Sequence, residues 1–70
     1  MNKERFEKEW NRAIEERGFA TLEAKGLKGQ YSMSIIVEEY KMTDANTRLL
    51  LFNGGKYIGT IDLKLISGII

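Results

Sequence analysis

Three carboxylates, Glu38, Glu39 and Asp44, are the residues whose type and spacing come nearest to chemistry in this chain. Paired carboxylates can bind Ca²⁺ or Mg²⁺, or share the work of a general acid and a general base. Adjacent residues of a strand point to opposite faces of a sheet, so Glu38 and Glu39 cannot form one site unless the strand ends there. The spacing also differs from that of an EF-hand loop. We therefore expect neither catalysis nor a metal site from this group.

Two glycine-containing segments could be imagined to hold a phosphate. Residues 26–29 match the Gly-x-x-Gly pattern of a KH-type RNA-binding loop, but that loop joins two helices, and here a strand pattern follows from Gln30. Residues 53–56 read Asn-Gly-Gly-Lys, without P-loop spacing and without the helix that should follow the lysine. We expect both segments to be plain turns.

The composition removes most other catalytic constellations. The 70 residues contain no cysteine and no histidine. This excludes disulfides and thiolate metal sites, and it removes the usual general base and the commonest metal ligand. We therefore expect a protein that is not an enzyme and that has no catalytic residue, cofactor or metal. The 11 basic and 10 acidic residues give a net charge of +1, so no overall field steers the chain toward nucleic acid or anionic lipid.

The length indicates a single domain over residues 1–70. At this size a hydrophobic core alone supplies about 3–5 kcal/mol of net stability, so association with another chain would help. No stretch approaches the roughly 18 consecutive apolar residues of a membrane span, and the N-terminus lacks the basic and apolar regions of a signal peptide. We expect a cytoplasmic protein that does not contact membranes.

An amphipathic helix is predicted over residues 3–17. Its apolar side chains recur at helical spacing on one side: Phe6, Trp10, Ala13 and Ile14. Asn2 suits the N-cap, and Gly18 suits the left-handed position after the last turn. The basic side chains opposite the apolar stripe have glutamates three or four residues away, as in Glu4/Lys8 and Arg12/Glu16. We therefore interpret the charged side as a solvated face rather than a phosphate-binding one.

Strands are predicted over residues 30–40, 47–52 and 56–66, where apolar side chains alternate with polar ones. Residues 20–24 could add a further short strand. The expected fold is α+β, with one N-terminal amphipathic helix packed on a three- to four-stranded antiparallel β-meander. The apolar end of the chain, residues 65–70, could extend the last strand, lie beside the helix or join an oligomer.

The loop at residues 53–55 decides which residues of the last two strands share a face. A two-residue Gly54-Gly55 loop places Arg48 opposite Ile61 on the apolar side. A three-residue Asn53-Gly54-Gly55 loop places Leu51 opposite Tyr57 instead. We prefer the three-residue loop because it buries no charge, although the two-residue loop would exchange the two faces.

The preferred register predicts two differently composed faces. The helix-covered face carries Tyr31, Met33, Ile35, Val37, Leu49, Leu51, Tyr57, Ile61 and Leu63. The opposite face carries Ile36, Tyr40, Leu50, Phe52 and Ile58, with Glu38, Arg48, Lys56, Thr60 and Asp62 around them. One helix can cover only one face of a sheet. The other face, with an apolar centre and a charged rim, resembles a protein interface in composition.

We therefore expect a protein-interaction module that associates with itself, as a homodimer or larger assembly, and binds a larger protein. The predicted interface residues are Ile36, Tyr40, Arg48, Leu50, Phe52, Lys56 and Ile58. Small unadorned chains of this kind often serve as inhibitors or accessory subunits, including on phages and other mobile elements.

Nucleic-acid binding is the alternative from another functional class. The phosphate-binding candidates are Lys25, Lys28, Arg48, Lys56 and Lys64, with Tyr40 or Phe52 available to stack on a base. Salt separates the two hypotheses, because phosphate neutralisation makes affinity fall steeply with ionic strength, whereas an apolar interface responds little.

Overall fold

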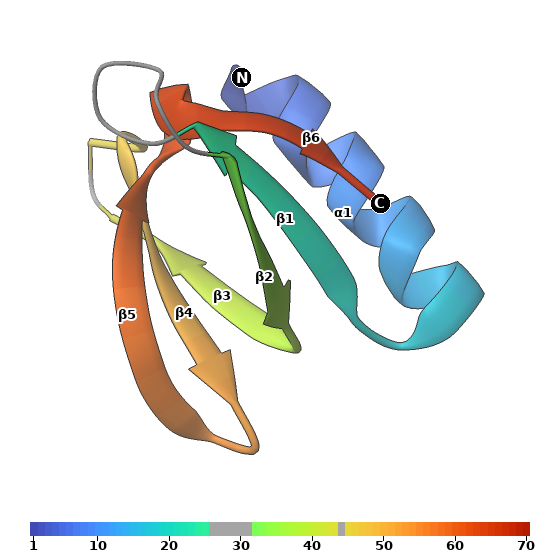
Figure 1. The fold of residues 1–70 in the computed structure, drawn as a ribbon. Helices are drawn as coiled ribbons and strands as arrows, with labels where there is room; N and C mark the ends of the chain where they lie inside the picture. The colour runs from blue at the N-terminus through green and yellow to red at the C-terminus, as the bar shows by residue number, and fades with distance from the viewer. Residues whose placement is uncertain (26–31, 44) are drawn as a thin grey trace.

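The chain folds into one helix and six antiparallel strands in a computed structural model, which describes residues 1–25, 32–43 and 45–70 (Figure 1). The elements are α1 (Lys3–Arg17), β1 (Ala20–Lys25), β2 (Ser32–Val37), β3 (Glu39–Met42), β4 (Arg48–Asn53), β5 (Lys56–Asp62), the 3-10 turn η2 (Leu63–Leu65) and β6 (Ile66–Ile69). The α+β class and the helix packed on antiparallel strands are confirmed. The described residues contain more strands than the three or four predicted.

Helix α1 begins and ends where its capping residues predict. The Asn2 side chain accepts a hydrogen bond from the Arg5 N–H at 2.8 Å, which satisfies one free donor of the first turn. Gly18 adopts the left-handed conformation with φ of 81° and donates its N–H to the Ile14 carbonyl at 2.8 Å. Both ends of the helix are thus fixed by local sequence.

The strands form two three-stranded sheets. Sheet A has the order β2-β1-β6, and sheet B has the order β3-β4-β5. A single residue, Glu38, separates β2 from β3, so the chain bends there and passes from one sheet into the other. The possible strand at residues 20–24 is confirmed as β1, which lies at the centre of sheet A.

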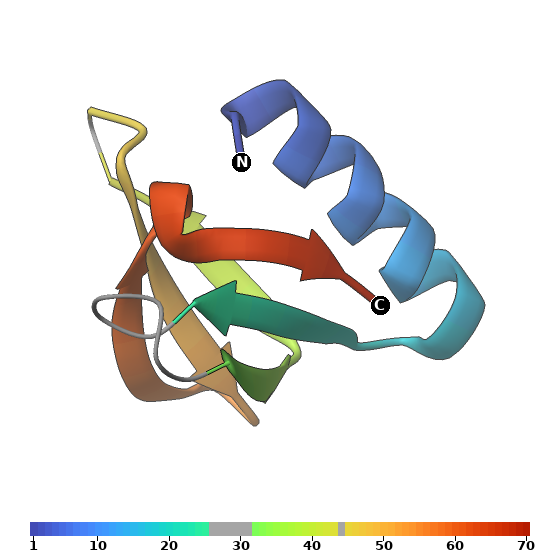
Figure 2. The same ribbon diagram turned by 45° about the horizontal axis from the view of Figure 1, so that its top comes forward.

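The core lies where the inner faces of both sheets meet the apolar side of α1. Its largest fully buried side chains come from all three parts: Phe6 of α1, Leu22 and Val37 of sheet A, and Leu49 of sheet B. Helix α1 runs alongside β6 and β1 (Figure 2). We predicted one sheet whose second face needs a partner. Folding at Glu38 divides the strands into two sheets that bury their inner apolar residues against each other and the helix, while Leu50 and Phe52 of the predicted second face stay outside this core.

Tyr40 lies on the core side of β3, and its predicted place on the open face is wrong. Its ring centroid is 4.9 Å from that of Phe6 and 4.7 Å from that of Trp10, with edge-to-face geometry. The prediction treated residues 30–40 as one strand. Because Glu38 belongs to neither strand, the alternation starts again at Glu39 and reverses the face of Tyr40.

The β4–β5 hairpin has the two-residue Gly54-Gly55 loop, so the three-residue loop that we preferred is wrong. Both glycines have positive φ, 59° and 78°, as a type I′ turn requires. The faces do not exchange, however, because the register shifts between Leu51 and Phe52. This bulge pairs Leu49 with Ile61 and Leu51 with Gly59. Leu49 and Leu51 therefore lie in the core and Arg48 lies outside it, as predicted. The bulge, rather than a three-residue loop, produces this arrangement.

The predicted strand over residues 56–66 is divided by η2. From this point buried side chains recur every third residue, at Leu63, Ile66 and Ile69. The first spacing of three spans the 3-10 turn, and the second lies in β6, whose pairing with β1 shifts register. The turn redirects the chain into β6, which pairs with β1 beside the helix. The apolar end of the chain therefore forms a strand of its own.

Candidate interaction surface

The outer face of sheet B carries the largest group of aromatic and apolar side chains directed away from the core. Leu49 and Leu51 of β4 point inward and are buried, so the alternating residues Leu50 and Phe52 point outward. The neighbouring strands complete what we call the sheet B face. Its centre is Leu50, Phe52, Tyr57 and Thr60, and its rim is Glu39, Lys41, Arg48 and Asp62.

Specific contacts order the centre of the sheet B face. The Phe52 and Tyr57 rings lie opposite each other on β4 and β5, with centroids 6.0 Å apart. The Tyr57 and Thr60 hydroxyls share a hydrogen bond of 2.5 Å. On the other side, the Lys41 ammonium lies 5.9 Å from the Phe52 ring centroid, within cation–π range. Tyr57 is nevertheless 59 % exposed, so an aromatic surface remains open to a partner.

The rim of this face carries balanced charge. Arg48 on β4 donates from Nε to the Asp62 carboxylate at 3.2 Å, across the β4–β5 pair. Glu39 lies opposite Phe52, and Lys41 lies opposite Leu50. Two cations and two carboxylates therefore surround the aromatic centre, and neither sign dominates.

A hydrogen-bonded corner fixes the hairpin that carries Phe52 and Tyr57. The Asn53 side chain donates to the Ile36 carbonyl at 2.8 Å and accepts from the Glu38 N–H at 2.7 Å. The Glu38 carboxylate in turn accepts the Gly54 N–H at 2.6 Å. The hairpin is thus tied to the bend between the two sheets, so that the position of β5 depends on this corner.

The structure brings together only part of the predicted interface. Arg48, Leu50 and Phe52 lie on the sheet B face, and Lys56 begins the strand that borders it. Ile58 is exposed in the bulge. Ile36 lies on the outer face of sheet A, opposite Thr21. Tyr40 lies in the core, where burial first and the nearby Glu7 carboxylate second raise the pKa of its hydroxyl.

Five residues of the sheet B face were absent from the predicted interface: Glu39, Lys41, Tyr57, Thr60 and Asp62. Tyr57 was assigned to the core because the bulge was not foreseen. A glycine inside a strand pattern often marks a bulge, and Gly59, with φ of 153°, stands at the register shift. That signal was present in the sequence. Thr60 was predicted only at the rim of this face.

Of the residues proposed for phosphate binding, Lys25 and Arg48 line one cleft, whereas Lys64 lies in η2. Lys25 ends β1, and Lys56 begins β5 on the other sheet. Lys28 and Asp44 lie outside the described residues. Within the described part of the chain no group of three acidic residues could hold a metal ion, and the Glu38 carboxylate binds the Gly54 amide instead.

Comparison with protein families, curated proteins and solved structures found no match to this chain. In the ranges that the structure describes, no helix is both long enough and apolar enough to cross a membrane. The functional argument therefore depends on the geometry of the surface itself.

Proposed function

We propose that this chain is a non-enzymatic protein-binding domain that uses the sheet B face to attach to a larger protein, as an inhibitor or accessory subunit does. The observation that supports it is the Phe52–Tyr57 pair, in which Tyr57 is exposed and Phe52 is half-buried, in the middle of a face with balanced charges. Aromatic side chains surrounded by a polar rim are the usual anchors of protein interfaces.

The support of the face by the fold also favours binding. Interfaces with a preformed geometry avoid part of the entropy cost of ordering side chains on association. Here Tyr57 is held by Thr60 and Phe52, and Asn53 fixes the hairpin beneath them. A partner would therefore meet a face that is already arranged.

Photo-crosslinking tests this proposal. A benzoylphenylalanine replaces Tyr57 in one variant and Asn11, an exposed residue of α1, in a control variant. Both are expressed in the cells that naturally produce the protein. We expect position 57, but not position 11, to crosslink to a defined protein, because only position 57 lies on the sheet B face. Identical products at the two positions would contradict the proposal.

Nucleic-acid binding is a second candidate, supported by the same aromatic pair. Phe52 and Tyr57 share one exposed face with Lys41, the combination that stacks on single-stranded bases. Fluorescence anisotropy with labelled dT and rU 12-mers, at 50 mM and 200 mM salt, tests it. Binding that weakens steeply with salt would support this candidate, and absence of binding at 50 mM would reject it.

Self-association and a cytoplasmic location complete the proposal. The first keeps part of its reason, because Leu50 and Phe52, which were predicted on the uncovered face, lie outside the core that forms when the chain folds at Glu38. If it occurs through the sheet B face, Tyr57→Glu should abolish it in sedimentation velocity experiments. Cell fractionation tests the location.

A further inference from the structure

Strand β5 is one of the two outer strands of sheet B, and its far edge has no strand beside it in the described residues. The Leu63 N–H binds the Thr47 carbonyl at 2.9 Å, in the same register that pairs Leu49 with Ile61. Backbone groups of an antiparallel strand point alternately to its two sides. The backbone N–H and C=O groups of Thr60 and Asp62 therefore point away from β4.

The outer edge of β5 lacks most of the features that usually prevent another strand from pairing with it. Edge strands commonly carry charged side chains or proline, which prevent another strand from adding to them. Between Lys56 and Asp62 the sequence is Tyr-Ile-Gly-Thr-Ile, with neither a charge nor a proline. One bulge interrupts the pairing with β4 near Gly59. The segment after the bulge remains regular and offers its outward groups to solvent.

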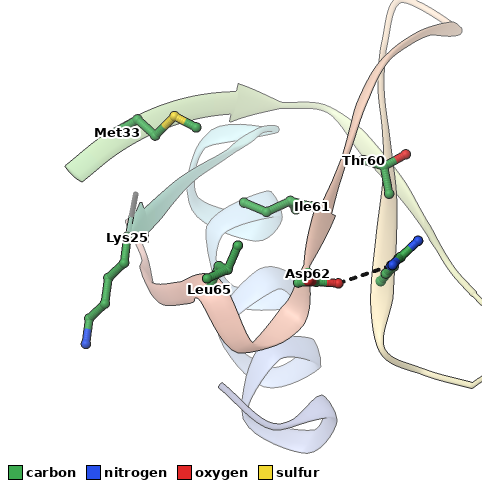
Figure 3. A pocket seen from close by; sticks show the side chains of 7 residues that line it. Lys25, Met33, Thr60, Ile61, Asp62 and Leu65 are labelled. Carbon is green, nitrogen blue, oxygen red and sulfur yellow. Dashed lines mark hydrogen bonds and ion pairs between the residues drawn. The ribbon is translucent and has the colours of Figure 1, made fainter. Parts of the chain in front are cut away.

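A cleft of about 410 Å³ lies beside the same segment of β5 (Figure 3). Figure 3 shows the side chains of Ile61 and Leu65 between β5 and the ends of β1 and β2, where Met33 and Lys25 stand. The lining residues are Lys25, Met33, Arg48, Thr60, Ile61, Asp62 and Leu65. The volume falls in the range of ligand-binding clefts, and the wall formed by Met33, Ile61 and Leu65 is apolar.

The rim of the cleft carries one cation without a carboxylate partner. Arg48 is paired with Asp62 at 3.2 Å, whereas Lys25 forms no ion pair within the part of the chain that the structure describes. A ligand with an apolar group for the cleft and a negative charge near Lys25 would satisfy both features.

We propose that the free edge of β5 binds an extended segment of another protein as a fourth strand of sheet B. One apolar side chain of the segment fills the cleft, and an acidic residue lies beside Lys25. Main-chain hydrogen bonds to Thr60 and Asp62 supply affinity, and the cleft supplies specificity, as in other cases of strand addition. This inference names the kind of partner for the proposed protein-binding role and rests on it.

The cleft favours a foreign segment over a second copy of this chain. A second copy that paired through β5 would present Ile61, but that side chain is 8 % exposed and belongs to its own core. The outer edge of β6 is also engaged, because helix α1 lies along it with the Glu9 carboxylate near the Ile69 N–H. Ile61 therefore cannot fill the cleft of a second copy without leaving its own core.

A random decapeptide library displayed on phage provides the probe. Selection uses the full chain, and the affinity of enriched peptides is measured by fluorescence anisotropy. We expect enriched sequences that contain an apolar residue together with an acidic one. Failure to enrich any sequence, or enrichment of basic sequences, would overturn the inference.

Thr60→Pro tests whether the strand edge is used, with Thr60→Val as its matched control. Both variants lose the hydroxyl that binds Tyr57, but only proline removes the outward N–H, and proline is tolerated where that N–H faces solvent. We expect about tenfold weaker peptide binding by Thr60→Pro and near wild-type binding by Thr60→Val. Equal binding by the two variants would reject strand addition.

A second pair of variants does not depend on how proline is tolerated. Met33→Glu places a charge in the apolar wall, and Ile36→Glu places the same charge on the opposite face of β2. The two residues are 51 % and 58 % exposed, so neither substitution disturbs the core. Peptide binding should be lost in Met33→Glu and kept in Ile36→Glu. The reverse result would move the site to sheet A.

Amide hydrogen exchange and Tyr57→Glu separate this inference from the proposed function. Bound peptide should slow exchange at Thr60 and Asp62, because their outward N–H groups become hydrogen-bonded. Peptide binding lost in Tyr57→Glu but kept in Thr60→Pro would support the sheet B face and overturn the edge inference. A dimer of the free chain that Thr60→Pro dissociates would assign the edge to a second copy, which also overturns it. A crosslink at position 57 would leave the proposed function standing in either case.

Discussion

The outer edges of β5 and β6 differ in what covers them. At β6 the Ile69 N–H lies near the Glu9 carboxylate of α1, and the Met1 nitrogen donates to the Leu63 and Ile66 carbonyls at 3.4 and 3.3 Å. Helix α1 runs along this edge (Figure 2). At β5 no element of the described chain takes the corresponding place.

This difference indicates what the helix does in the fold. It completes the core through Phe6 and Trp10, and it also occupies the edge where sheet A would otherwise accept another strand. A single helix can protect only one edge. Of the other outer strands, β2, β3 and β5, we place strand addition at β5, because it contributes the most residues to the cleft and borders the sheet B face.

Phe6→Ala should have the largest effect, because it loosens the helix from the covered edge. Phe6 is fully buried and its ring contacts Trp10 and Tyr40. Removing a buried phenylalanine side chain costs about 3–5 kcal/mol, comparable to the total stability expected of a domain this small. We expect a largely unfolded variant in urea titrations followed by circular dichroism.

Asn11→Ala provides the control for the helix. Asn11 is exposed on α1, and substitutions at such positions usually change stability by less than about 0.5 kcal/mol. A Phe6→Ala variant as stable as Asn11→Ala would show that the helix does not hold the core. The covered edge of β6 would then need another explanation.

Asn53→Ala should have an intermediate effect and should act on the open edge. It removes the hydrogen bonds to the Ile36 carbonyl and from the Glu38 N–H, which tie the β5 hairpin to the bend. We expect a loss of about 1–2 kcal/mol in the free energy of unfolding. Amide exchange should accelerate in β4 and β5 more than in β1 and β6.

Asn53→Asp separates the contributions of the two hydrogen bonds that the Asn53 side chain makes. It keeps the acceptor for the Glu38 N–H but loses the donor to Ile36, and it places a second carboxylate beside Glu38. We expect it to be no more stable than Asn53→Ala. Uniform acceleration of exchange across both sheets would show instead that the corner supports the whole fold rather than the hairpin alone.

The helix could be predicted to the residue because its determinants are local. Asn2 and Gly18 act on the nearest turns, and the spacing of Phe6, Trp10 and Ala13 needs no knowledge of the rest of the chain. The buried leucines of β4 were also placed correctly, since any register that buries Arg48 is costly.

The bend and the bulge could not be placed in this way, because each is decided by contacts between distant residues. Glu38 belongs to neither strand. Its backbone N–H binds the side chain of Asn53, which is 15 residues further along the chain. The bulge at Gly59 shifts the register, so that Leu49 lies opposite Ile61 on the apolar inner face although the loop has only two residues. Each inserts one residue into an alternating pattern, and one residue suffices to reverse a side chain's face.

These two reversals explain which residues of the candidate surface were predicted correctly and which were not. Leu50 and Phe52 lie on β4, whose alternation the extra residue in β5 does not interrupt, and were assigned to the outer face correctly. Tyr40 follows the bend, and Tyr57 lies across the bulge, so the two tyrosines were exchanged between core and surface. The free edge of β5 became apparent only from the strand order, which depends on how β6 pairs with β1.

Glu9→Gln should have the smallest effect and should act on the covered edge. The hydrogen bond from Arg5 at 2.6 Å is the main cause that lowers the pKa of the Glu9 carboxyl, and the Ile69 N–H contributes. A pKa that is lower in the folded state stabilises the fold above the unfolded value of 4.5. That stability is lost as the pH falls from there through the native pKa.

Urea midpoints at pH 7 and pH 3 measure this contribution. Because the ion pair is exposed to solvent, we expect Glu9→Gln to cost only about 0.2–1 kcal/mol at pH 7 and to reduce the acid sensitivity of the wild type. Glu16→Gln, an exposed glutamate of the same helix, should keep the wild-type sensitivity. Faster exchange of the Ile69 amide in Glu9→Gln alone would show that this carboxylate covers the β6 edge. Equal exchange in both variants would leave the edge protected by the packing of the helix rather than by its charge.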